Sequence, residues 1–171
     1  MEDAAALSLA EHVVLAVLDE QPAHGFAVAA LTAATGPLGR VWQVPRPVVY
    51  RALGRLEDLG LVVPEAVESG RGPQRTVFAV TAAGRALVRE WLQTPVEHVR
   101  DVRSYLLLKL ALLDRRGQSP ARLVKRQKAV IAPIVDAVSR PRDDVEGFDA
   151  TLVAWRRASA RATAAFLDDI G

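Results

Sequence analysis

The 171-residue chain contains no cysteine and a single methionine, and only 5% of its residues are aromatic. Without cysteine, disulfide bonds, thiolate zinc sites and cysteine nucleophiles are all excluded. The three histidines, His12, His24 and His98, are scattered, and no two of them have the spacing of a metal site. We therefore predict that the protein binds no metal and needs no cofactor.

Long hydrophobic runs are also missing, although half of the residues are hydrophobic and can form a core. The most apolar run, residues 105–113, is far shorter than the roughly 20 residues that span a bilayer, and it contains Lys109. The amino end has no basic segment followed by an apolar core, so we expect no signal peptide. These observations predict a cytoplasmic protein that is not associated with a membrane.

Catalytic motifs are equally scarce. The sequence has neither the G-x-S-x-G turn of a hydrolase nor the G-x-x-x-x-G-K-[ST] loop that binds nucleotide phosphates. The carboxylate pairs Asp143–Asp144 and Asp168–Asp169 lie in an expected linker and near the chain end, where solvation explains them. We interpret His24 as a residue that begins a helix and bonds to the backbone rather than as a ligand. The sequence therefore predicts a protein that is not an enzyme.

Positive charge is sparse overall but concentrated locally. The formal net charge is only +2, and residues 1–39 contain five acidic side chains and no lysine or arginine. Residues 40–75, in contrast, contain six arginines against four acidic side chains. In the amino-terminal half, this second segment is therefore the candidate for contact with a polyanion.

Residues 44–63 have the form of a DNA-reading helix that leads into a strand. Pro47 suits the first turn of a helix, where backbone N–H groups have no partner in any case. After it, apolar residues repeat at i, i+4 and i+7, which predicts one buried stripe; these residues are Val49, Leu53 and Leu56. Asp58 and Gly60 close the helix, and Gly60 has the place of a left-handed C-cap.

The opposite side of this helix carries Arg51, Gly54 and Arg55, with Tyr50 on its flank. A glycine inside a helix costs about 1 kcal/mol relative to alanine. That cost is acceptable where another backbone must come close, and the sugar-phosphate backbone of DNA is such a backbone.

Residues 61–81 predict a β-hairpin. Strand-forming residues flank the glycine- and proline-rich loop 69–75, which contains Arg71 and Arg75. Pro64 limits the first strand to an edge position. A hairpin with arginines at its tip, directly after a recognition helix, is the winged-helix arrangement: the helix enters the major groove and the wing reaches phosphates or the minor groove. We therefore favour DNA binding over an ordinary helix and hairpin with a solvated arginine face.

These segments resemble the PadR family of transcriptional regulators. Residues 15–26 resemble the family's "LL…GPLHGYEI" opening, residues 49–62 its "LYRALRRLEEEGLV" helix, and residues 70–85 its "GGPPRKYYRLTEAGR" wing. Phe26 and Phe78 stand where these patterns have tyrosine. The resemblance implies a dimeric winged-helix regulator, usually a repressor, that loses DNA affinity when it binds a small molecule.

The remainder of the chain predicts helices only, and Thr94-Pro95 is the expected boundary. We therefore predict a mostly α protein with a small β-wing: a winged helix-turn-helix DNA-binding domain at residues 1–94 and a helical dimerisation domain at residues 95–171. A helix at 103–114 is apolar on almost every side. A second begins at Ser119-Pro120, and Pro133 should kink or break it. The last carries an apolar stripe of Phe148, Leu152, Trp155, Ala162 and Phe166.

A homodimer is expected because three helices alone cannot cover the leucine-rich helix on every side. A two-fold pairing would place two recognition helices about 34 Å apart on a pseudo-palindromic operator. The predicted DNA contacts are Gln43, Arg46, Pro47, Tyr50, Arg51, Arg55, Arg71 and Arg75. A basic cluster in the second half is interpreted as a solvated face; its members are Arg122, Lys125, Arg126 and Lys128.

A small hydrophobic or aromatic effector is expected at the junction of the two domains. The candidate effector residues are Trp91, Tyr105 and Trp155, although plain packing is the favoured interpretation of the two tryptophans. The alternative function is a winged-helix protein-interaction module without DNA binding, which the acidic first 39 residues favour. Among DNA-binding proteins, the MarR type is the nearest competitor, but it normally places helices at both ends of the wing domain.

Overall fold

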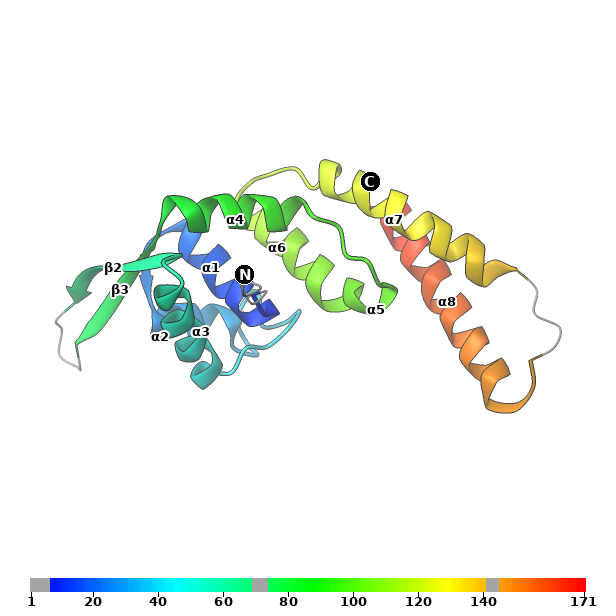
Figure 1. Ribbon diagram of the computed structural model, residues 1–171, viewed down its shortest axis with the longest axis horizontal. Helices are drawn as coiled ribbons and strands as arrows, with labels where there is room; N and C mark the ends of the chain where they lie inside the picture. Colours follow the sequence, from blue (N-terminus) through cyan, green and yellow to red (C-terminus); the bar gives the residue numbers. More distant parts are fainter. Residues whose placement is uncertain (1–6, 69–73, 141–144) are drawn as a thin grey trace, which may run out of the picture.

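The computed structural model describes residues 7–68, 74–140 and 145–171. In Figure 1 a winged-helix unit lies at one end of the molecule, two long helices lie at the other, and α6 lies between them beneath α4. The elements are, in chain order, α1 (Leu9–Glu20), β1 (Ala23–His24), α2 (Gly25–Thr32), α3 (Arg46–Asp58), β2 (Val62–Glu68), β3 (Arg75–Val80), α4 (Ala82–Gln93), α5 (Val99–Asp101), the π-helical turn η1 (Val102–Leu106), α6 (Leu107–Arg115), α7 (Ala121–Ser139) and α8 (Gly147–Asp169).

Helix α1 begins with a reciprocal cap. The Ser8 hydroxyl accepts the N–H of Glu11, and a carboxylate oxygen of Glu11 accepts the N–H of Ser8. This pair satisfies two of the N–H groups that the first turn of a helix leaves without a partner. Most of the helix is buried, so α1 is the central helix of the winged-helix unit.

Helix α3 ends as predicted. Gly60 has a positive φ of 65°, and its N–H bonds to the Glu57 carbonyl while the Leu61 N–H bonds to the Leu56 carbonyl. These two bonds form a Schellman motif, which satisfies the last carbonyls and stops the helix. The predicted stripe of Val49, Leu53 and Leu56 is buried. Strand β2 therefore starts two residues after Gly60.

The sheet has the order β1-β3-β2, and both pairings are antiparallel. Pro64 lies on the edge strand β2, as predicted, beside an irregularity in the pairing between Pro64 and Ala66. Strand β1 was not expected from the sequence. It is only two residues long, and Ala23 and His24 pair with Phe78 and Val77 of β3. This pairing ties the start of α2 to the base of the wing.

Helix α2 ends at Thr32. The buried Thr32 hydroxyl lies within hydrogen-bond distance of the Val28 and Val44 carbonyl oxygens, at 3.3 and 3.4 Å. The Val44 N–H bonds in turn to the Thr32 carbonyl. The segment after α2 therefore folds back onto the end of this helix and leads to the start of α3.

The structure contradicts the reason given for dimerisation, that the leucine-rich helix predicted at residues 103–114 cannot be covered within one chain. This helix runs as α5, η1 and α6, and its leucines pack into one core with α1 and α4. The leucines that are fully buried within the single chain are Leu106, Leu108, Leu112 and Leu113. A second copy is thus not needed to cover them, because the winged-helix unit does so.

The last two helices differ from the sequence predictions in three details. Helix α7 begins one residue later than expected, and it is not broken at Pro133, one of the two effects predicted for this proline. The buried residues of α8 are Ala160, Thr163 and Leu167, and not the predicted stripe. Phe148 and Trp155 of that stripe are 77% and 69% exposed. In the described part of the chain, no helix is long and apolar enough to cross a membrane.

Candidate nucleic-acid interface

The exposed side of α3 carries most of the predicted DNA contacts. Arg46, Pro47, Tyr50 and Arg51 are all exposed, and Arg46 is the first residue of the helix. Gln43 is exposed in the turn before α3. Gly54 also faces outward, and a Cβ at this position would meet no other atom within 4 Å. This side of α3 can therefore be approached closely.

Phe26 connects the recognition helix to the wing, a role the sequence did not reveal. Its ring is 45% exposed and lies 5.2 Å from the Arg46 guanidinium and 5.0 Å from that of Arg75 on β3. Arg46 also lies 5.6 Å from the Tyr50 ring. These are cation–π distances. Phe26 thus holds one arginine of α3 and one of the wing at the same surface. Arg71, the other predicted wing residue, lies outside the described residues.

Arg55 has a partner within the protein. Its Nη1 donates to both carboxylate oxygens of Glu11, at 2.9 and 3.1 Å, and its side chain is 39% exposed. A cavity of about 300 Å³ lies between α1 and α3, and Ser8, Glu11, Arg51 and Arg55 all line it. The arginine side of α3 therefore continues to the amino-terminal end of α1, where partial positive charge also favours anions.

His24 has the structural role that we favoured. It is the N-cap of α2, and its Nδ1 accepts the N–H of Ala27 at 3.0 Å. No group of histidine and acidic side chains within the described ranges has the arrangement of a metal site.

The candidate effector residues do not form one cluster within the chain. Trp91 is buried and stacks on His12 with ring centroids 4.8 Å apart. Tyr105 is half-buried against the same core, whereas Trp155 is exposed on α8. Only Trp91 and Tyr105 therefore belong to the region where the winged-helix unit meets η1 and α6.

Lys109 is the buried cation of this region. It is 3% exposed, its Nζ donates to the Thr94 carbonyl at 2.6 Å, and it lies 5.0 Å from the Trp91 ring. Burial lowers the pKa of Lys109 to about 8. Burial is also the main cause that lowers the pKa of His12. Both groups therefore favour their neutral forms more than they would in water.

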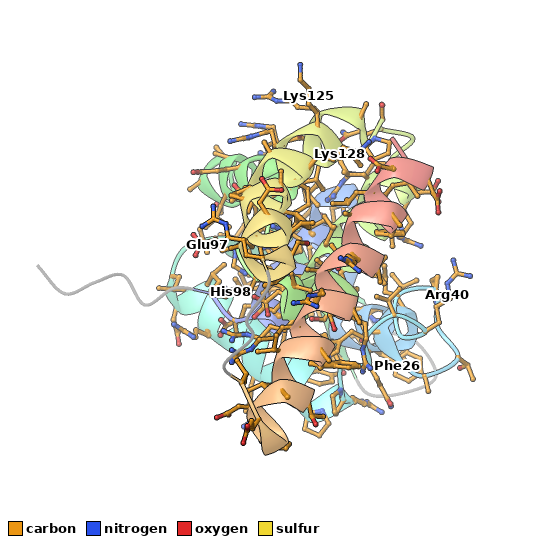
Figure 2. All side chains as sticks on the ribbon, turned by 90° about the vertical axis from the view of Figure 1, so that its right-hand side faces the viewer. Phe26, Arg40, Glu97, His98, Lys125 and Lys128 are labelled. Atoms are coloured by element: carbon orange, nitrogen blue, oxygen red, sulfur yellow. The ribbon has the colours of Figure 1, made fainter. Side chains whose placement is uncertain are left out.

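The basic cluster of α7 lies away from α3. Figure 2 labels Lys125 and Lys128 at one end of the α7–α8 pair, whereas Phe26 lies toward the other end of the molecule's vertical axis. Lys128 forms an ion pair with Asp168 at 3.1 Å, and Arg126 donates to the Gln93 carbonyl at 2.9 Å. Part of this cluster thus bonds within the protein.

A recognition helix, a wing and surface arginines on both define a winged-helix DNA-binding protein. Residues 14–90 match the model of the transcriptional regulator PadR-like family. This match assigns residues 14–90, which contain the recognition helix and the wing, to a family of DNA-binding transcriptional regulators whose members are not enzymes. A comparison with curated proteins found no match.

Several solved structures are similar to the chain. Bacillus subtilis PadR in complex with operator DNA is 16% identical, with 94% of this chain and 96% of that chain covered and a TM-score of 0.48. The same protein in complex with p-coumaric acid is 14% identical, with 95% and 93% covered and a TM-score of 0.43. A PadR family regulator from Clostridium difficile is 17% identical, with 49% and 88% covered and a TM-score of 0.41.

Proposed function

We propose that the protein is a homodimeric repressor in the cytoplasm that binds a pseudo-palindromic operator and is released by a small-molecule effector. The observation that carries this proposal is the surface on which Phe26 brings Arg46 of α3 next to Arg75 of the wing. An interaction module without DNA binding would not require arginines on both elements. The acidic first 39 residues, which favoured that alternative, include Glu11, whose charge is paired with Arg55.

The DNA contacts divide by role in this proposal. Arg51 and Tyr50 face the major groove from the exposed side of α3. The residues near phosphates are those at the start of this helix, Gln43, Arg46 and Pro47. The DNA contacts of the wing are made by Arg71 and Arg75. Arg55 contacts a phosphate at the α1–α3 cavity and keeps its bond to Glu11. The assignments on α3 and of Arg75 rest on exposure and on the lining of the α1–α3 cavity. The assignment of Arg71 rests on the sequence alone.

The two-fold contact is placed on the carboxy-terminal helices. Phe148 and Trp155 lie two turns apart on α8 and are the most exposed large hydrophobic side chains among the described residues. A pairing of identical faces would cover them in both copies. Residues 1–94 would then act as the DNA-binding domain and residues 95–171 as the dimerisation domain, with α6 completing the core of the former.

The effector region is proposed at Trp91 and Tyr105, where α4 meets η1 and α6. Trp155 would join it only in the dimer, because it is exposed on α8 in the single chain. An aromatic ligand that binds there should quench tryptophan fluorescence and lower operator affinity together. Quenching without an effect on DNA binding would remove this region from the proposal.

The central test is a mobility shift with DNA from upstream of the protein's own gene, at several salt concentrations. The double variant Arg51→Ala/Arg71→Ala should lose at least tenfold in affinity, because each lost contact contributes about 1–3 kcal/mol. Lys125→Ala is the matched control, since it removes one exposed charge on α7, away from α3. Unchanged affinity of the double variant at physiological salt would refute operator binding by this surface.

A further inference from the structure

Two side chains of α7 hold the chain where it leaves the winged-helix unit. Residues 94–98, between α4 and α5, have no regular secondary structure, so buried backbone groups in this segment need side-chain partners. The Gln127 side chain accepts the Val96 N–H through Oε1 at 2.7 Å and donates from Nε2 to the Val96 carbonyl at 2.8 Å. Arg126 donates to the carbonyl of Gln93, the last residue of α4, at 2.9 Å. Helix α7 is therefore fixed to the end of α4 by directional bonds.

Gln127 interrupts an apolar stripe of α7. The buried residues of this helix are Leu123, Val124, Gln127 and Ile131, and the Gln127 side chain is fully buried. A buried amide costs free energy unless its donor and acceptor groups are bonded, and Gln127 meets this condition through Val96. A glutamine among leucine, valine and isoleucine therefore calls for a reason other than the burial of apolar area.

Apolar contacts alone specify the position of α7 only weakly. Their energy depends on the area that is buried and hardly on direction, so a helix held by them alone can tilt or slide more freely. The paired bonds of Gln127 require a defined length and direction. They form in only one placement of α7 on the winged-helix unit. A single buried polar residue fixes the register of paired helices in coiled coils in the same way.

The placement of α7 has a large effect farther along the molecule. Helix α8 packs along α7, and both helices extend away from the winged-helix unit (Figure 1). From Gln127 to Ser139, the last residue of α7, the helix is roughly 18 Å long. A tilt of about 10° at Gln127 therefore moves the far end of α7 by roughly 3 Å, which is close to the rise of about 3.4 Å per base pair in DNA. In a dimer joined through α8, such a tilt changes the separation of the recognition helices by about one base pair.

We propose that Gln127 is a positioning residue that determines which half-site spacing the dimer accepts. It holds α7 in one placement at the end of α4, and α7 carries α8 with the contact between the two copies. The two recognition helices therefore keep a fixed separation, and an operator whose half-sites lie closer together or farther apart is rejected. This inference rests on the proposed repressor function and on the proposed contact at Phe148 and Trp155.

The test compares the natural operator, delimited by footprinting in DNA from upstream of the protein's own gene, with versions that have one central base pair added or removed. Each change moves one half-site by about 3.4 Å and rotates it by about 34°. In mobility shifts, the wild type should bind both altered operators about tenfold more weakly than the natural one. Gln127→Leu keeps the stripe apolar but removes both bonds to Val96, so its affinities should differ by about threefold at most. Discrimination equal to that of the wild type would overturn the proposal.

Gln127→Glu supplies a readout that a purely structural role would not change. At pH 7.5 its carboxylate can accept the Val96 N–H but cannot donate to the Val96 carbonyl, so the discrimination should be lost. Burial raises the pKa of a carboxyl group, and at pH 5 the protonated acid can both donate and accept, so the discrimination should return. Gln118→Glu makes the same change at an exposed position and should behave like the wild type at both pH values. No recovery in Gln127→Glu at pH 5 would contradict the proposed role.

Amide exchange of Val96 separates this inference from the repressor function. The Val96 N–H should exchange faster in Gln127→Leu than in the wild type or in Gln118→Glu, whether or not the protein binds DNA. A wild type that binds no upstream DNA but protects Val96 through Gln127 would refute the repressor function and leave the attachment of α7 intact. Operator binding with the same spacing preference in every variant would leave the repressor function intact and refute the role of Gln127.

Discussion

Nη1 of Arg55 on α3 lies 2.9 Å from the Glu11 carboxylate on α1, so one cation of the arginine side of the recognition helix is paired inside the protein. Burial acts to raise the pKa of Glu11, but hydrogen bonds from Ser8 and Arg55 outweigh burial and lower it. Glu11 thus has two functions: it caps its own helix and fixes the orientation of α3 against α1.

Glu11→Gln should therefore separate stability from DNA affinity. Glutamine keeps the cap but removes the charge, so unfolding should become easier by about 1–2 kcal/mol. The wild type should lose this contribution as the pH falls from 4.5 through the lowered pKa of Glu11, and the variant should not. Thermal unfolding at pH 7 and pH 3 measures both effects.

The same variant should bind DNA more tightly, because the Arg55 charge is no longer neutralised. The slope of affinity against salt should steepen by up to about one. Glu20→Gln is the control: it removes the same charge from the far end of α1, where Glu20 pairs with Arg115. If both variants changed the slope equally, overall charge alone would be responsible.

Phe26→Ala should weaken operator binding, because Arg46 and Arg75 lose the ring that holds them at one surface. Two exposed cation–π contacts contribute about 1–2 kcal/mol together, so we expect a five- to thirtyfold loss in mobility shifts. Phe26→Tyr keeps the ring and should bind like the wild type. Equal affinities of the alanine and tyrosine variants would show that the ring does not organise the interface.

Gly54→Ala should have opposite effects on stability and on DNA binding. A Cβ at this position meets nothing within the protein, so the helix should gain up to about 1 kcal/mol. If the sugar-phosphate backbone approaches α3 at this point, the added methyl group should reduce operator affinity. Melting temperature and mobility shifts measure the two effects on the same sample. A more stable variant with full affinity would show that DNA does not approach there.

Signals within short segments predicted most of the winged-helix unit. The predicted C-cap Gly60 located the end of α3 correctly, because a cap acts on a backbone within a few residues. The position of Phe26 between Arg46 and Arg75 could not be predicted in this way. These residues come from three elements, and only the fold brings them together.

In the second half of the chain, the periodicity of apolar residues predicted helices but not the elements against which they pack. The pattern in residues 103–114 correctly indicated a helix that must be covered all round, but it could not say by what. The cover is α1 and α4 of the same chain. Likewise, α8 buries a narrow face of Ala160, Thr163 and Leu167, because α7 lies against it. Its aromatic residues Phe148 and Trp155 stay exposed.

The exposed aromatic residues of α8 can be tested as the contact between copies. Phe148→Ala/Trp155→Ala should dissociate the dimer at micromolar concentration in analytical ultracentrifugation. The fold of each copy should be unaffected, because both side chains are mostly exposed in the single chain. Operator affinity should fall with the loss of the second recognition helix. A wild-type monomer at this concentration, or a variant that still dimerises fully, would contradict the proposed contact.

Lys109 should make the protein more stable at alkaline pH. Its pKa is about 8 in the folded protein against 10.5 for a lysine in water, and burial is the cause. Below pH 8 both states carry the proton and the folded state bears the cost of a buried charge. Between pH 8 and 10.5 the unfolded state binds more protons, so the free energy of unfolding should rise with pH, by on the order of 3 kcal/mol.

Lys109→Met is the variant that isolates this effect. Methionine removes the charge but also leaves the Thr94 carbonyl without its donor, at a cost of about 1 kcal/mol. At pH 7 the variant should be at least as stable as the wild type in urea unfolding, and its stability should no longer rise between pH 8 and 10.5. An alkaline rise that persists in the variant would show that another group causes it. A variant that is much less stable than the wild type at pH 7 would show that Lys109 is stabilising in its charged form, through Thr94 and the Trp91 ring.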